Sequence, residues 1–394
     1  FKYDTSEQMA RLFDLEDSGY FYTRLQNPTN DAVAAKIAAL EGGVAAMLTS
    51  SGQAANFYAI FNICQAGDHF VCSSTIYGGT FNLFGVTLKK LGIDVTFVNP
   101  DASEEEISAA FRPNTKALFG ETISNPTLEV LDIEKFARIA HSHGVPLIVD
   151  NTFPTPINCR PFEWGADIVV HSTTKYMDGH ATSVGGAIVD SGNFDWDAHA
   201  DKFPGLCTPD ESYHGLTYTK AFGKMAYITK ATAQLMRDRG QHPVSNKRIP
   251  TEPGSGNTAP AYAPTLQECT SGSRVSCPER QSGLGELLWS AGRQILRAGT
   301  EVHAERLLRA LCTFGLKGGR EESIKFMDSL KLAAIVTHVA DARTCVLHPA
   351  SHTHRQLTDE QLMEAGVRPD LIRFSVGIEN AEDIIADIEQ ALNA

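Results

Sequence analysis

Two short apolar runs lie close together in residues 146–176, and polar side chains follow each of them. The runs are Pro146–Val149 and Ala166–Val170, and their β-branched residues between turn-forming residues predict buried strands. Asp150 follows the first run, and Lys175 comes shortly after the second. Ligands of open α/β sheets bind at the carboxyl ends of the strands, so we expect this acid and this lysine at one binding edge.

An acid and a lysine at neighbouring strand ends suit pyridoxal phosphate. A lysine amine can form a Schiff base with the aldehyde of this cofactor, and a carboxylate can keep the pyridine nitrogen protonated. Both residue types also have common structural roles, because an aspartate often caps a helix and a lysine after a strand is often solvated. The pair alone leaves both interpretations open.

Strand-like and helix-like segments alternate along the first part of the chain. Apolar strand-like runs such as 69–74 and 115–122 alternate with helix-like stretches such as 31–41 and 132–143. This alternation is typical of a parallel sheet that helices cover on both faces. We therefore expect an α/β fold with a large parallel-sheet domain over residues 31–240.

From Thr313 onward, the order of strand, helix, strand-like segments and closing helix predicts a smaller α+β domain over residues 313–394. Arg373, in a strand-like stretch, is a candidate clamp for a substrate carboxylate, although a surface arginine is the commoner case. Loop histidines commonly form hydrogen bonds and the carboxylate pattern of a metal site is absent, so we expect no metal at these three positions: His348, His352 and His354.

Two stretches nearer the N-terminus have features of phosphate sites. Tyr22 and Arg24 precede a predicted helix, and an arginine can bind phosphate in a bidentate manner. Gly52 and Gln53 follow two serines at the start of another helix, where free backbone N–H groups favour anions. Each signal is weak alone, because most such caps bind nothing. A serine nucleophile lacks support, because GxSxG is absent.

Tyr77 and Asn125 follow predicted strands and could contact a flat ring. Tyr77 lies beside two glycines that permit close approach, so its ring could stack on a cofactor, but a packed turn tyrosine is equally common. Asn125, in a Ser-Asn-Pro-Thr turn, could reach a phenolic oxygen.

The composition excludes several classes of partner. A net charge of -13 argues against nucleic acid, since a phosphate backbone requires a basic face. The sequence has no run of eighteen apolar residues and no visible signal peptide, so we expect no membrane span. The eight cysteines lack CxxC spacing, which favours free thiols in a reducing cytoplasm.

Residues 241–312 depart from the rest of the chain. Six of the eighteen prolines fall within 241–280, and the stretch shows no period of 2 or 3.6 residues. A linker of this length inside a compact domain is unusual. With freely chosen wobble bases, a reading shifted by one nucleotide from His242 gives a helix-like sequence that begins IPSPTNAFLLNLGLETL and rejoins the chain at Thr313. We therefore hypothesise a pair of compensating frameshifts, near Gly240 and near Leu311.

The chain resembles the pyridoxal-phosphate enzymes of cysteine and methionine metabolism that catalyse γ-elimination and γ-replacement. The resemblance covers about 1–240 and 313–394, and the shifted reading extends it. The motifs that carry it are YTRLQNPTN, SSGQAA, YGGTFNL, ETISNPT, VDNTFPTP, HSTTKYMDGH, CVLHPASHTH and DLIRFSVGIE. It implies the fold type I of aspartate aminotransferase.

The resemblance also implies a role for each candidate residue. Lys175 would be the Schiff-base lysine, Asp150 the partner of the pyridine nitrogen, and Tyr77 the stacking residue that assists proton transfer. The residues implied to hold the phosphate are Gly52, Gln53, Ser172 and Thr174, joined by Tyr22 and Arg24 from a neighbouring subunit. Asn125 would contact the ring oxygen. Arg373 and the nearby Thr344 would bind the substrate carboxylate.

The implied reaction is the conversion of O-acetylhomoserine and sulfide or methanethiol to homocysteine or methionine and acetate. The implied assembly is a tetramer of two active dimers. Because the sequence begins at Phe1, we expect residues 1–30 to be a shortened form of the arm that completes the neighbour's site in relatives.

Three alternatives to this activity stay open. Methionine γ-lyases usually carry a cysteine two residues after the stacking tyrosine, where this chain has Gly79, so we favour replacement over elimination. Cystathionine synthesis or cleavage is the second alternative, and an inactive, frameshifted remnant is the third. The sequence does not decide between acetyl and succinyl leaving groups, or between sulfide and methanethiol.

Overall fold

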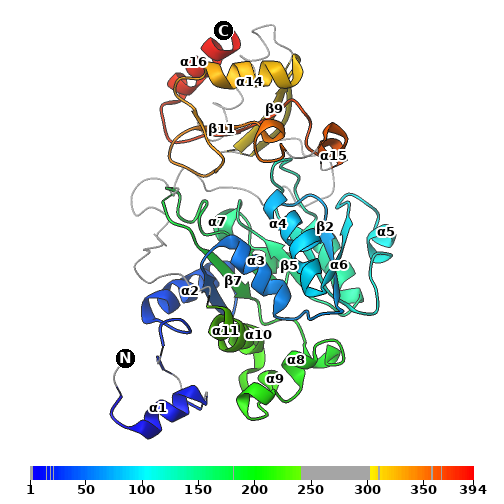
Figure 1. Ribbon diagram of the computed structural model, residues 1–394, viewed down its shortest axis with the longest axis vertical. Helices are drawn as coiled ribbons and strands as arrows, with labels where there is room; N and C mark the ends of the chain where they lie inside the picture. The colour runs from blue at the N-terminus through cyan, green and yellow to red at the C-terminus, as the bar shows by residue number, and fades with distance from the viewer. Residues whose placement is uncertain are drawn as a thin grey trace.

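A mixed sheet forms the centre of the larger domain in the computed structural model, which describes residues 3–14, 16–17, 19–20, 22–180, 182–240, 302–308, 311–355, 358–364 and 366–394 (Figure 1). The strand order of this seven-stranded sheet is β1-β7-β6-β5-β4-β2-β3. Its strands are β1 Ala45–Thr49, β2 His69–Ser73, β3 Asp94–Val98, β4 Thr115–Glu121, β5 Leu147–Asp150, β6 Ile168–His171 and β7 Gly186–Asp190.

The expected parallel sheet includes one antiparallel strand. β7 is antiparallel to both of its neighbours, β1 and β6, whereas β2 to β6 pair in parallel. The chain leaves β6 at its carboxyl end and enters β7 at the same edge, after residues 172–185 and without a crossover helix. The strands predicted at 146–149 and 166–170 are confirmed as β5 and β6, each shifted by one or two residues.

Helices cover both faces of this sheet. On one face, the α2 residues Ala34, Ile37 and Ala38 pack with Leu48 and Val169. On the other face, Ala55 and Ala59 of α3 share the main core with Met47, Val170 and Ile188. The helices of this domain are α1 Ser6–Phe13, α2 Pro28–Glu41, α3 Gly52–Phe61, α4 Gly78–Asn82, α5 Glu104–Ser108, α6 Ile133–Ser142, α7 Thr155–Asn158, α8 Pro204–Cys207, α9 Tyr218–Phe222, α10 Ala226–Lys230 and α11 Arg237–Arg239.

The two ends of α2 show how the sequence sets these boundaries. Asn27 caps the helix, because its side chain accepts a hydrogen bond from the N–H group of Thr29. Pro28 occupies the first helical position. Gly42 ends the helix with a φ of 81°, a left-handed conformation that favours glycine. The predicted helix over 31–41 therefore begins three residues earlier than expected and ends where expected.

The smaller domain is a second sheet with helices, at the end of the molecule opposite α1 (Figure 1). Its strand order is β10-β11-β12-β9-β8, and its core includes Phe314, Phe326, Val346, Ile372 and Ile388. The elements are β8 Val302–Leu308, β9 Leu311–Leu316, α14 Gly319–Ser329, β10 Ala334–Ile335, β11 Cys345–Leu347, α15 Asp359–Glu364, β12 Leu371–Ser375 and α16 Ala381–Leu392. The expected α+β organisation is present.

Most of the segment interpreted as frameshifted, 241–301 and 309–310, lies outside the described residues. Within it, β8 pairs with β9 in an antiparallel manner, so the second sheet begins before the boundary expected at Thr313. None of the described helices is long and apolar enough to cross a membrane.

Candidate active site

The carboxyl ends of β4, β5 and β6 bring the predicted acid and lysine to one edge of the sheet. Glu121 and Asp150 are directly opposite each other in neighbouring strands, and Asp150 lies opposite Val170 of β6. Lys175 follows β6 in a turn, in which its N–H group donates to the Ser172 carbonyl at 3.2 Å. Burial, and next the charge of Arg373, lower the pKa of the Lys175 amine. This pKa shift favours the neutral amine that carbonyl and proton-transfer chemistry requires.

Asp150 is a buried carboxylate with donors on both oxygens. Its Oδ1 accepts from the N–H group of Thr152 at 3.1 Å and from the Thr152 hydroxyl, and its Oδ2 accepts from Asn56 Nδ2 at 3.3 Å. Burial raises its pKa, while the Thr152 hydroxyl and the charge of His171 act in the opposite direction. A cationic partner such as a protonated pyridine nitrogen would favour the charged carboxylate.

Glu121 is a second buried acid at this edge. Its Oε2 accepts from the N–H group of Tyr77 at 2.7 Å. Burial and the charge of Asp150 raise the pKa of Glu121 well above its usual value. The predicted site residues did not include Glu121, Thr152 or Asn56. The Asp-Asn-Thr sequence was a signal for the Thr152 contact, since an aspartate often accepts from the backbone two residues on.

The start of α3 fits a phosphate group. A Cβ atom on Gly52 would lie 2.5 Å from the Ser172 Cβ, so only glycine lets the helix start approach this loop. The helix is capped by Ser51, whose side chain accepts from the N–H group of Ala54. The N–H groups of Gly52 and Gln53 at this helix start, together with the Ser172 hydroxyl, are donors of the kind that an anion requires.

Gln53 and Thr174, the other predicted phosphate ligands, already have protein partners. Gln53 Nε2 donates to the Thr80 hydroxyl at 2.8 Å. The Thr174 hydroxyl donates to the Gly185 carbonyl at 3.2 Å and accepts from its N–H group at 3.1 Å. Their phosphate roles stay predictions.

Tyr77 and Gly79 lie at the start of α4, where the N–H group of Tyr77 contacts Glu121. The Tyr77 side chain is 45% exposed, so its ring has a free face. A Cβ atom on Gly79 would lie 2.5 Å from Cε1 of the Tyr77 ring. A side chain at position 79 would therefore force this ring to move.

Arg373 of β12 reaches across from the smaller domain to Asn125. Its Nη1 donates to Asn125 Oδ1 at 2.9 Å, and its Nη2 donates to the carbonyls of Thr337 and His338 at 3.1 and 3.3 Å. Arg373 is 4% exposed, burial lowers its pKa to about 10, and its Nε has no partner. Among the described residues, no acid forms an ion pair with it, so a buried cation is available for an anion.

Thr344, the other residue predicted at the substrate carboxylate, has protein partners of its own. Its hydroxyl donates to Glu379 Oε2 at 2.8 Å and accepts from the N–H group of Gly377 at 3.0 Å. The fully buried Thr344 side chain therefore holds the turn after β12, and its role toward the substrate stays a prediction.

Tyr22 and Arg24 contact each other, and Arg24 contacts the start of α11 in the same chain. The Arg24 guanidinium lies 5.1 Å from the centre of the Tyr22 ring and donates to the Arg237 carbonyl. Tyr22 is exposed. The expected role of the two side chains, binding the cofactor phosphate in a neighbouring subunit, stays a prediction.

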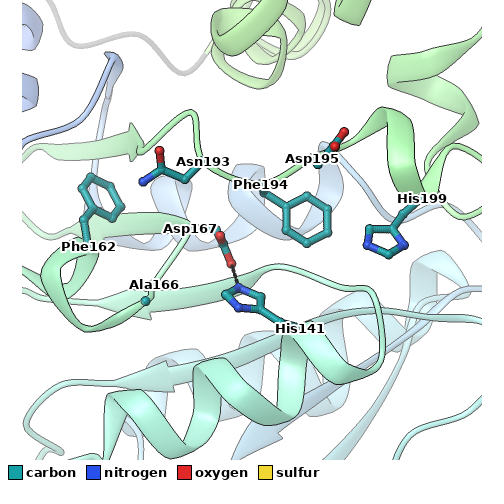
Figure 2. Close-up of a pocket in the computed structure, with 9 residues that line it drawn as sticks. His141, Phe162, Ala166, Asp167, Asn193, Phe194, Asp195 and His199 are labelled. Atoms are coloured by element: carbon teal, nitrogen blue, oxygen red, sulfur yellow. Dashed lines mark hydrogen bonds and ion pairs between the residues drawn. The ribbon is translucent and has the colours of Figure 1, made fainter.

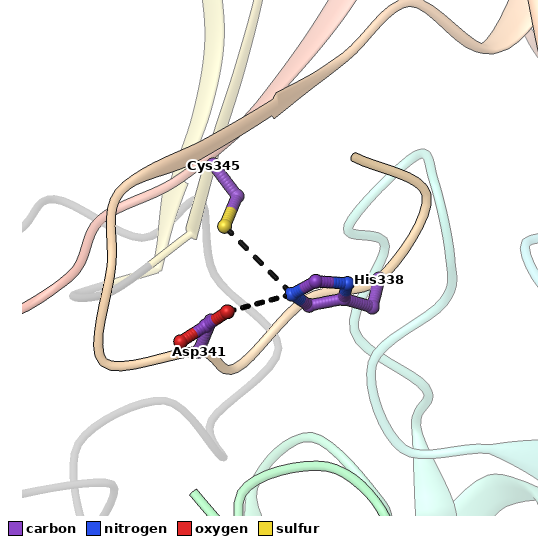
Figure 3. Close-up of side chains that lie close together, drawn as sticks. All are labelled: His338, Asp341 and Cys345. Carbon is purple, nitrogen blue, oxygen red and sulfur yellow. Dashed lines mark hydrogen bonds and ion pairs between the residues drawn. The ribbon is translucent and has the colours of Figure 1, made fainter. Parts of the chain in front are cut away.

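Two other clusters lie outside this edge. His141 and Asp167 line a pocket at the amino end of β6, together with Phe194 and His199 (Figure 2). His338, Asp341 and Cys345 converge within 4.8 Å (Figure 3). Asp341 Oδ2 already accepts from His338 and Arg343, and the Cys345 thiol donates to the Arg343 carbonyl. The hydrogen bonds of this second cluster therefore hold the loop between β10 and β11.

The fold and the site together define a pyridoxal-phosphate enzyme of fold type I. A model of the Cys/Met metabolism PLP-dependent enzyme family matches residues 1–237 and 298–393. The chain belongs to this family, whose cofactor is pyridoxal phosphate.

Curated relatives match over nearly the whole chain. An O-acetyl-L-homoserine sulfhydrylase of Leptospira meyeri is 42% identical over 98% of this chain and 89% of its own length. A homocysteine synthase of Schizosaccharomyces pombe is 43% identical over 97% of this chain and 89% of its own length.

Solved structures share the fold. A protein described as an O-acetylhomoserine (thiol)-lyase of Campylobacter jejuni, which contains N'-pyridoxyl-lysine-5'-monophosphate, has a TM-score of 0.86 and 29% identity, and the alignment covers 100% of this chain and 93% of that one. A cystathionine gamma-lyase of Lactobacillus plantarum, 24% identical with a TM-score of 0.73 over 100% and 91% of the two chains, is similar in fold.

Proposed function

We propose that this chain catalyses γ-replacement on O-acetylhomoserine, with sulfide or methanethiol as the nucleophile, to give homocysteine or methionine and acetate. The single observation that carries the substrate class is Arg373, a buried guanidinium without an acidic partner among the described residues. It lies close enough to Lys175 for its charge to lower the pKa of that amine. An amino-acid carboxylate bound to Arg373 would therefore lie beside the predicted catalytic lysine.

Residues at the strand ends would hold the cofactor. Asp150 would pair with the pyridine nitrogen, the α3 start and Ser172 would hold the phosphate, and Lys175 would carry the covalent bond. When bound, pyridoxal phosphate supplies an electron sink that stabilises negative charge at the substrate carbon atoms.

The remaining steps are the work of this chain's own side chains. Arg373 would hold the substrate carboxylate, while Asn125 orients the guanidinium. The Lys175 Nζ, once free, would take the proton from Cα and then move a proton at Cβ, and Tyr77 would assist this transfer. The Cγ–O bond then breaks and releases acetate, and a Cγ–S bond forms with the sulfide or thiol.

A product assay tests this proposal. The purified chain with O-acetylhomoserine and sulfide should form homocysteine and acetate, and Lys175→Ala should abolish this product. Ketobutyrate and ammonia without homocysteine would instead identify a lyase. Omission of sulfide is the matched control, since a γ-replacement enzyme requires its nucleophile.

We propose further that the chain acts in the cytoplasm as a homotetramer of two active dimers. The exposed Tyr22 ring and the adjacent Arg24 guanidinium, which bonds to the Arg237 carbonyl, support sites that two subunits share. Light scattering should give four times the mass of the chain. Arg24→Ala should weaken cofactor binding, and mixing it with Lys175→Ala should restore some sites with both residues intact.

A further inference from the structure

A buried acid–imidazole pair lies beneath the strand ends that carry the cofactor residues. Glu41, the last residue of α2, accepts a hydrogen bond at 2.6 Å from Nε2 of His171, the last residue of β6. Both side chains are fully buried. The pair therefore lies next to Ser172, the first residue of the loop that leads to Lys175.

The same carboxylate oxygen also holds the residue after Asp150. Glu41 Oε1 accepts from Asn151 Nδ2 at 3.0 Å. Asn151 also donates to the Cys159 carbonyl at 2.8 Å, and its Oδ1 accepts from the Thr122 hydroxyl at 3.0 Å. One carboxylate oxygen thus fixes the carboxyl ends of both β5 and β6.

Two polar atoms of this pair have no partner. Glu41 Oε2 and His171 Nδ1 are both buried and without a hydrogen bond. Unsatisfied buried groups are rare in folded proteins, and charged ones are costly. Packing alone does not account for retaining them here, whereas a charge required beside the cofactor does.

The groups around His171 are mostly acidic. Its charge acts to lower the pKa of Asp150, against the effect of burial. Glu121 is the other acid that faces Asp150, and its pKa is raised by burial and by Asp150. Cys159, whose pKa is raised to about 12 by burial and next by Glu41, faces the pair from α7. Of these four groups, His171 is the basic one.

We propose that Glu41 and His171 are positioning residues that keep Asp150 aligned and charged toward the pyridine nitrogen of the cofactor. Glu41 orients the imidazole, and a positive charge on His171 would offset the negative charge that burial disfavours on Asp150. The inference rests on the proposed role of Asp150, but not on γ-replacement.

The test uses the full chain with pyridoxal phosphate. Two substitutions keep the approximate shape but remove the charge: Glu41→Gln and His171→Gln. Each variant is titrated with the cofactor by visible absorbance, and the absorbance of the bound form is then followed against pH. His69→Gln is the matched control, because His69 is a buried imidazole at the opposite edge of the same sheet, bonded to Thr115 and Thr96.

We expect both variants to raise the cofactor dissociation constant about tenfold, to shift the pH midpoint of the visible band, and to retain the far-ultraviolet circular dichroism of the original chain. His69→Gln should lower the thermal midpoint and leave both cofactor readouts unchanged. A loss of thermal stability in Glu41→Gln and His171→Gln, with an unchanged dissociation constant and pH midpoint, would overturn the inference. Normal cofactor readouts in the original chain without homocysteine formation would contradict only the proposed function.

Discussion

At the residue scale, the guanidinium of Arg373 determines whether the chain binds an amino-acid carboxylate. Arg373→Lys keeps the charge but loses the fork that contacts Asn125 and the two carbonyls. We expect KM for O-acetylhomoserine to rise about 10- to 100-fold, since a hydrogen bond to a charged group contributes about 1.5–3 kcal/mol. Steady-state kinetics measures this change.

The control for Arg373 is another arginine in the same domain. Arg320 forms a surface ion pair with Asp359. Arg320→Lys should leave KM unchanged, because exposed ion pairs contribute little. Equal KM values for the original chain and Arg373→Lys would contradict the carboxylate assignment.

His141 gives a pH dependence at the same scale. Its Nε2 interacts with Asp167 Oδ2 at 2.8 Å (Figure 2), and this contact raises the pKa of His141 against the effect of burial. Because the pKa is higher in the folded state, the stabilisation is complete below the unfolded pKa and is lost as pH rises through the folded pKa. The His141 side chain is 43% exposed, so solvent limits the effect to about 0.5 kcal/mol.

Asp167→Asn should therefore lower the pKa of His141 toward its ordinary value, as measured by NMR titration of the imidazole protons. Urea denaturation should then lose the part of its pH dependence that lies just above the ordinary histidine pKa. His143 is the internal control, because burial and next Lys202 lower its pKa. If the pKa of His141 is the same in Asp167→Asn as in the original chain, the contact does not raise that pKa.

At the scale of elements, one carboxylate fixes the turn between α14 and β10. Asp387 of α16 accepts from the N–H groups of Lys331, Leu332 and Ala333 at 2.7–2.9 Å, and it is buried. Asp387→Ala would leave three N–H groups without an acceptor, so we expect the free energy of unfolding to fall by about 3 kcal/mol. Urea denaturation measures this loss. Glu389→Ala, at an exposed position of the same helix, should change it by less than about 0.5 kcal/mol.

The elements and strand ends were predictable because they depend on local pattern. The caps of α2 and the acid that ends β5 are visible in a few consecutive residues. The direction of β7 was not, because it depends on whether the preceding connection crosses the sheet. The bond between Thr344 and Glu379 was not predictable either, because the two residues are 35 positions apart. Glu41 and His171 are 130 residues apart, so no short motif joins them.

At the scale of the molecule, the proposed site is complete only when both domains meet. Asn125 follows β4 of the larger sheet, whereas Arg373 belongs to β12 of the smaller one, and the two side chains bond directly. The chain between these domains includes residues 241–301. Any change there that alters how the domains approach would therefore act on the substrate carboxylate site.

The proposed frameshift leads to the last prediction. The family match omits residues 238–297, which supports a change of reading frame that begins near Gly240, and it resumes at residue 298, before the second slip hypothesised near Leu311. A chain that carries the shifted reading over 242–310 should bind more pyridoxal phosphate per subunit and unfold at a higher temperature than this chain. The reason is that a helix-like apolar pattern can bury surface, whereas a proline-rich stretch without a period cannot. Visible absorbance and thermal denaturation of both proteins measure these differences. Resequencing of the coding DNA should show two compensating single-nucleotide slips, and a verified frame without them, together with equal cofactor content in both proteins, would refute the proposal.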